Sequence, residues 1–161
     1  MNTSHTSKRP PSAQQVGRAG ELFVAAELNR RGVAATLYLT NAPRVDVVAT
    51  SPDGQRTVNI QVKTKGPRSR VWQWSTTRAK AECEAPDTDY MILVDLAEEH
   101  PAYYIHRLRD VAQDCHTRHE AWIARVGKRP HNPDSTHTAI EVDQVVSGKG
   151  AWDVLGVLPQ K

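Results

Sequence analysis

The sequence has few cysteines and no long apolar run, and each absence excludes a class of protein. Only two cysteines occur in 161 residues, Cys83 and Cys115, in no metal-binding or redox spacing. A disulfide scaffold is therefore excluded, and we expect both thiols to stay reduced in a cytosol. No apolar stretch approaches the roughly 20 residues that cross a bilayer. Residues 1–11 are polar, unlike a secretory signal, so we expect a cytoplasmic protein without a membrane partner.

Several familiar functional motifs are also missing. The chain has no glycine-rich phosphate loop, no serine elbow and no zinc-finger spacing. His116 and His119 could share a metal ion, but no acid or cysteine completes a set, and exposed helix histidines are commoner. The sequence therefore predicts no organic cofactor.

Positive charge is concentrated in the first half of the chain. Residues 1–80 carry thirteen Lys and Arg against four Asp and Glu, whereas residues 81–161 carry eight against fourteen. This asymmetry favours one basic face that could meet a polyanion, with an acidic remainder. An unevenly charged solvated surface is the alternative.

Apolar periodicity predicts a mixed α/β fold in one domain. After a disordered tail over 1–12, the domain spans 13–161. Ser12 and Gln15 resemble a helix capping box, and Gly32 ends the helix that follows. We expect helices over 13–31, 75–85 and 107–125, and strands over 34–39, 45–50, 57–65, 90–96, 102–106 and 139–146. A turn at 51–54 makes the second and third strands an antiparallel hairpin.

The third of these strands carries a polar face. Asn59, Gln61 and Lys63 alternate with valine and isoleucine at the two-residue period of a strand. Such a stripe is often no more than a solvated face. Asp46, however, stands among valines in the preceding strand, fourteen residues before Gln61. On the first helix Glu21 lies near the apolar stripe, where it either points inward to a partner or pairs with Arg18 at the surface.

These elements together resemble the PD-(D/E)xK nuclease superfamily. The resemblance covers roughly residues 14–96: a helix containing Gly20-Glu21-Leu22-Phe23, a strand with Asp46, and a strand with Gln61-Val62-Lys63. It is similar to archaeal Holliday-junction resolvases, and the Gln-x-Lys form is similar to Mrr-type restriction endonucleases. The resemblance implies a restriction-endonuclease-like core over about 14–106: a helix, a three-stranded meander, a helix and a strand, extended by a C-terminal helix and strand.

The resemblance also implies roles for the site residues. Asp46, Gln61, the backbone carbonyl of Val62 and Glu21 would hold Mg²⁺ or Mn²⁺, directly or through water. Lys63 would orient or deprotonate the attacking water. The family usually has an acid where this chain has Gln61, so weaker metal binding is expected, and loss of catalysis is an alternative.

Cations surround the expected site. We expect nucleic acid to contact a set of residues on either side of the motif: Arg44, Lys65, Arg68, Arg70 and Gln73. Trp72 and Trp74 could stack on bases or pack on the hairpin.

The sequence thus predicts a metal-dependent DNA endonuclease of structural or low sequence specificity. It contains no separate module for reading bases. A homodimer would supply two sites for two strands. One alternative is an inactive nuclease fold that binds nucleic acid or a protein; another is a structural protein with a charged sheet face.

Overall fold

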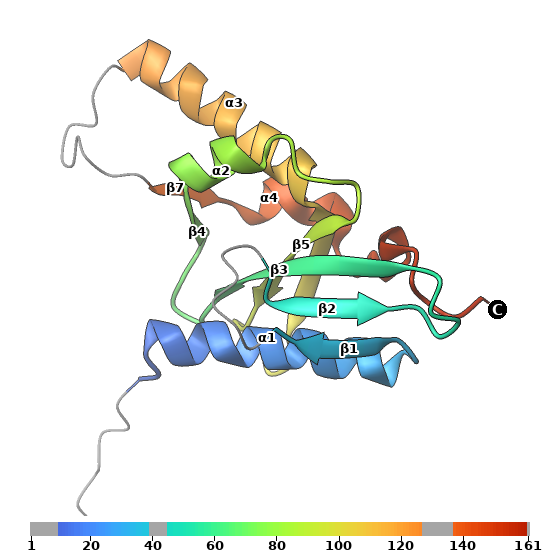
Figure 1. The fold of residues 1–161 in the computed structure, drawn as a ribbon. Coiled ribbons are helices and arrows are strands. Elements are labelled where there is room, and N and C mark those ends of the chain that lie inside the picture. Colours follow the sequence, from blue (N-terminus) through green and yellow to red (C-terminus); the bar gives the residue numbers. More distant parts are fainter. Residues whose placement is uncertain (1–9, 39–44, 127–136, 161) are drawn as a thin grey trace, which may run out of the picture.

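A five-stranded mixed sheet, in the order β1-β2-β3-β5-β6, forms the centre of the molecule (Figure 1). The structure is a computed structural model that describes residues 10–38, 45–126 and 137–160. The sheet strands are β1 (Ala34–Leu37), β2 (Val47–Thr50), β3 (Thr57–Lys65), β5 (Asp89–Asp95) and β6 (Ala102–Arg107). β1, β2 and β3 form the expected antiparallel meander, β5 runs parallel to β3, and β6 is antiparallel to β5. The mixed α/β prediction is confirmed.

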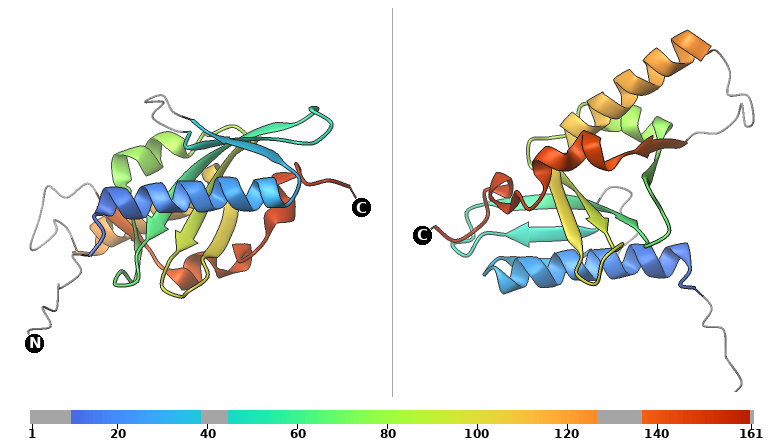
Figure 2. Two further views of the ribbon diagram at one scale, coloured as in Figure 1. Left: turned by 90° about the horizontal axis from the view of Figure 1, so that it is seen from below. Right: turned by 180° about the vertical axis from the view of Figure 1, so that it is seen from behind.

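Helices cover both faces of this sheet (Figure 2). The helix α1 (Ala13–Arg30) crosses one face, while α2 (Thr76–Glu82), α3 (Leu108–Val126) and the short α4 (Val142–Val145) lie on the other. No helix in the described part of the chain is long and apolar enough to cross a bilayer. Most of the expected disordered tail, residues 1–9, falls outside the described residues.

The ends of α1 follow the local sequence signals. Ser12 and Gln15 form the capping box in full, since each side chain bonds the backbone of the other residue. The helix stops at Gly32, whose φ of 82° suits a residue without Cβ. Val24 and Leu28 are fully buried beneath the sheet.

Alternation along the strands sorts their side chains onto the two faces. Even-numbered residues of β3 and β5, such as Ile60 and Ile92, pack with α1 and with Trp152 near the C-terminus. Odd-numbered residues of β5, such as Met91 and Leu93, pack with α2 and α3. The odd-numbered side chains of β3, including Gln61 and Lys63, therefore point away from the α1 core.

A second, two-stranded sheet lies outside the main one, and it corrects one detail of the prediction. The strand β4 (Trp72–Ser75) pairs antiparallel with β7 (His137–Ile140), and not with the main sheet. The expected last strand over 139–146 stops at Ile140, because Glu141 and Gln144 form a capping box that starts α4. Trp72 and Trp74 are 1 % and 2 % exposed, so they pack and do not stack on a base.

Where α1 crosses β3, Gly20 lies directly against Thr64. A Cβ on residue 20 would overlap Thr64 Oγ1 and stand only 2.9 Å from Thr64 Cβ. We expect Gly20→Ala to lower the free energy of unfolding by about 1–3 kcal/mol through overpacking. Alanine in a helix normally stabilises relative to glycine by about 1 kcal/mol, so the sign of the effect is diagnostic. Urea unfolding measures it.

Gly17, one turn earlier on α1, provides the matched control. A Cβ there meets nothing within 4 Å. Gly17→Ala should therefore stabilise the protein by up to about 1 kcal/mol. Equal effects of the two substitutions would contradict the close approach of α1 to β3.

Candidate active site

Asp46 is held against β3 on both sides of Gln61. Its amide donates to the carbonyl of Ile60 (2.9 Å), and its carboxylate Oδ2 accepts the amide of Val62 (2.7 Å). The regular β2–β3 pairing begins one residue later, at Val47 and Ile60. The Val62 amide thus donates to the Asp46 side chain and not to a backbone carbonyl of β2. This bond fixes the Asp46 carboxylate next to the β3 backbone at Gln61 and Val62.

The side chain of Gln61 contains a buried acceptor without a partner. Gln61 is 3 % exposed, and its Oε1 has no hydrogen-bond partner among the described residues. An unsatisfied buried acceptor costs about 1–3 kcal/mol unless a water or an ion meets it, and Thr64 Oγ1 and Trp74 Nε1 are in the same situation. This oxygen is available to a ligand.

Lys63, two residues further on β3, shares an electrostatic environment with Asp46. Burial lowers the pKa of Lys63, and the charge of Asp46 only partly opposes this. Burial likewise raises the pKa of Asp46, against the Val62 hydrogen bond and the charge of Lys63. The two pKa values therefore move toward each other, a pattern typical of functional sites.

Glu21 approaches the same site from α1. It forms an ion pair with Arg18 (2.8 Å) at a side-chain exposure of 24 %. Its negative charge also raises the pKa values of Asp46 and Lys63. Both alternatives for Glu21 thus hold in part, because it pairs with Arg18 and still acts electrostatically on Asp46.

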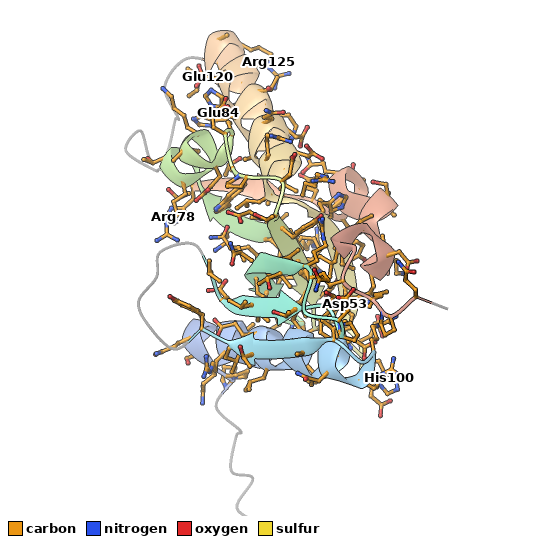
Figure 3. The ribbon with its side chains drawn as sticks, turned by 45° about the vertical axis from the view of Figure 1, so that its right-hand side comes forward. Asp53, Arg78, Glu84, His100, Glu120 and Arg125 are labelled. Atoms are coloured by element: carbon orange, nitrogen blue, oxygen red, sulfur yellow. The ribbon has the colours of Figure 1, made fainter. Side chains whose placement is uncertain are left out.

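Arg78 acts electrostatically on the same two side chains, although no sequence motif pointed to it. Its charge lowers the pKa values of both Asp46 and Lys63, the same two groups that Glu21 influences. Figure 3 shows its side chain projecting outward from α2. Ser75 caps α2 and accepts the Arg78 amide (3.4 Å), which sets the start of the helix. The position of Arg78 depends on how α2 packs against the sheet, which no motif in the sequence indicates.

The donor set suits a hard cation. Asp46 and Gln61 offer one carboxylate and one amide oxygen, the ligand types that Mg²⁺ and Mn²⁺ accept. Among the described residues no three His, Cys, Asp or Glu side chains converge as a metal site. A cation here would thus complete its coordination with water or with a backbone carbonyl. Coordination by the backbone carbonyl of Val62 stays a prediction.

The residues expected to contact nucleic acid differ in their surroundings. Arg68, Arg70 and Gln73 are exposed, and neither arginine forms an ion pair with a described residue. Arg44 lies outside the described residues.

Lys65 is more enclosed than these residues. It is 6 % exposed, ion-paired to Asp95 (2.5 Å) and 5.0 Å from the Trp72 ring centroid. A phosphate contact by Lys65 would compete with this internal ion pair, and it stays a prediction.

Comparison with known proteins shows similarity in structure and not in sequence. No family model matches the chain, and no curated protein matches it. The Holliday junction resolvase Hjc of Archaeoglobus fulgidus superposes with a TM-score of 0.52 at 17 % identity, over 89 % of this chain and 98 % of that one. The bacterial homing endonuclease I-Ssp6803I superposes with a TM-score of 0.52 at 15 % identity, over 91 % of this chain and 94 % of that one. The chain has the restriction-endonuclease-like fold of these two proteins.

Proposed function

We propose that this protein, which shares its fold with two nucleases, is a divalent-cation-dependent DNA endonuclease. The observation that supports this most directly is that Asp46 is bonded to the backbone on both sides of Gln61, whose buried side-chain oxygen has no partner among the described residues. Lys63 lies on the same strand face. A buried acceptor without a partner calls for an explanation, and a bound cation would supply one for Gln61.

Each side chain has a distinct part in phosphodiester hydrolysis. Asp46 and Gln61 would hold Mg²⁺ or Mn²⁺, which when bound supplies charge stabilisation at the phosphate and a more acidic water. The lowered pKa of Lys63 increases the neutral fraction of its amine, which can accept a proton from the attacking water at Nζ. Glu21 would hold a water from the helix side.

Arg78 adds positive charge at the same place. Its charge acts on both Asp46 and Lys63, so a phosphate beside those groups would be attracted to it as well. We assign it to the binding of a phosphate, for which a guanidinium is well suited. Arg68 and Arg70 would extend this contact along the DNA backbone.

The proposal is tested by incubating the protein with duplex, branched and single-stranded DNA in Mg²⁺, in Mn²⁺ and in EDTA. We expect cleavage with a divalent cation only, at a rate that rises with pH and levels off below the ordinary lysine pKa of 10.5. Lys63→Met should reduce the rate by about 10²–10⁴-fold and flatten the profile.

Lys80→Met is the matched control, since Lys80 is exposed on α2 and lies outside the site. It should cleave at the wild-type rate. Unchanged cleavage by Lys63→Met would refute the role of the lysine. Salt-dependent DNA binding without cleavage in any metal would identify an inactive nuclease fold.

A further inference from the structure

A cleft of about 600 Å³ opens beside Lys63. One wall comes from the start of α1, with Pro11, Ala13 and Val16; the other comes from the segment after β3, with Pro67, Val71 and Gln73. Lys63 itself lines the cleft, which is therefore continuous with the candidate active site.

The surface of this cleft is unusual for a site that would meet only phosphates. Most of its exposed surface is apolar, with Pro10, Pro11, Pro67, Val16 and Val71 among the lining residues alongside Lys63 and Lys65. A Cβ on Gly66 would stand 3.6 Å from Val16, so the segment after β3 comes close to α1 here. Apolar walls suit the face of an aromatic ring. Gln73 adds an exposed amide that can donate and accept hydrogen bonds, and Arg68 adds a cation.

The dimensions decide what can enter. The volume lies within the range of pockets that hold one small molecule, so a nucleotide fits and a double helix does not. Bases in a duplex are stacked and paired, and must leave the stack to enter such a pocket. An unpaired nucleotide avoids most of that cost.

We propose that this cleft receives one unpaired nucleotide of the DNA substrate, placing the adjoining phosphate at Lys63. The inference rests on the proposed nuclease function and adds the substrate class. Branched, gapped or flapped DNA with an unpaired nucleotide is preferred over continuous duplex by about ten-fold or more, since unpairing a base costs a few kcal/mol.

The test compares a duplex with the same duplex carrying a short unpaired flap. Binding is measured in Ca²⁺ by fluorescence anisotropy, and cleavage in Mn²⁺ on a gel. Ala13→Trp places an indole in the cleft from an exposed helix position. It should reduce flap binding and flap cleavage to the level of the duplex, and leave both duplex values unchanged.

Gln14→Trp is the control, because Gln14 is exposed beside Ala13 and does not line the cleft. It should behave as wild type. Equal binding of flap and duplex by wild type overturns the inference, as does equal loss of selectivity in both tryptophan variants. A third outcome separates the two proposals. If wild type binds flaps selectively, Ala13→Trp loses that selectivity and no variant cleaves DNA, the role of the cleft is supported and the nuclease function is refuted.

Discussion

Asp46→Asn is expected to abolish cleavage while raising the melting temperature of the metal-free protein. Burial raises the pKa of Asp46 despite the Val62 hydrogen bond and the charge of Lys63, so the ionised form is disfavoured in the fold. Asparagine keeps an acceptor for the Val62 amide without the charge. Loss of the carboxylate at a metal-dependent site should lower the cleavage rate by about 10³-fold.

The direction of the Asp46 pKa shift determines how the stability gained by Asp46→Asn changes with pH. With a raised pKa in the folded state, the contribution of Asp46 to stability is fully present below the ordinary carboxyl pKa and is lost as pH rises through the folded value. Asparagine does not titrate. The stability difference between Asp46→Asn and wild type should therefore be largest near pH 7 and vanish below about pH 4.

Thermal melts with and without Mn²⁺ separate binding from stability. At a cation concentration ten times the dissociation constant, wild type should gain about 1.4 kcal/mol, whereas Asp46→Asn gains nothing. Asp143→Asn, an exposed acid on α4, is the control and should keep both cleavage and the Mn²⁺ shift. Equal Mn²⁺ stabilisation of wild type and Asp46→Asn would exclude Asp46 as a ligand.

The second large effect concerns Gln61. We expect Gln61→Glu to tighten divalent-cation binding by about ten- to hundred-fold, or about 1.4–2.8 kcal/mol. A unit charge 4 Å away at an effective dielectric of 20 contributes about 4 kcal/mol, and twice that for a divalent ion. Desolvation of a carboxylate at this buried position, 3 % exposed in the wild type, offsets several kcal/mol of the gain.

The same substitution should destabilise the protein without metal. A second carboxylate beside Asp46, with Glu21 already raising its pKa, adds like-charge repulsion. The metal-free melting temperature of Gln61→Glu should therefore fall as pH rises from 5 to 8. Titration calorimetry with Mn²⁺ and melts across this pH range measure the two effects.

Gln61→Met distinguishes the oxygen from the volume of the side chain. Removing the orphaned Oε1 should stabilise the metal-free protein by about 1 kcal/mol and eliminate the cation response. If Gln61→Glu and Gln61→Met have the same cation affinity as wild type, residue 61 is not a ligand.

Elements with strong local signals could be predicted from the sequence. The Ser12–Gln15 capping box, the stop at Gly32 and the turn at Gly54 (φ 71°) depend only on neighbouring residues. Alternation in β3 likewise assigned Gln61 and Lys63 to one face, away from the α1 core. That alternation contains no information about burial, so it could not show that the Gln61 oxygen is enclosed without a partner.

Features that depend on distant pairing were not predictable. Lys65 and Asp95 face each other only because β3 and β5 are parallel in one particular register. Arg78 reaches the site only because α2 docks on the same sheet face as Asp46 and Lys63. In both cases the deciding partner is fifteen or more residues away along the chain, and no local preference encodes its position.

The pairing of β4 with β7 determines when the cleft can be completed during synthesis. The strands of the main sheet are all available once residue 107 has been made, but β4 lacks its partner until residues 137–140 follow. Closing a loop of more than sixty residues has an entropic cost that local contacts do not have. The wall that carries Gln73 and leads into α2 therefore orders late, after the Asp46–Gln61 arrangement on β2 and β3. A nascent chain would assemble the proposed cation ligands before the surface proposed to select the substrate.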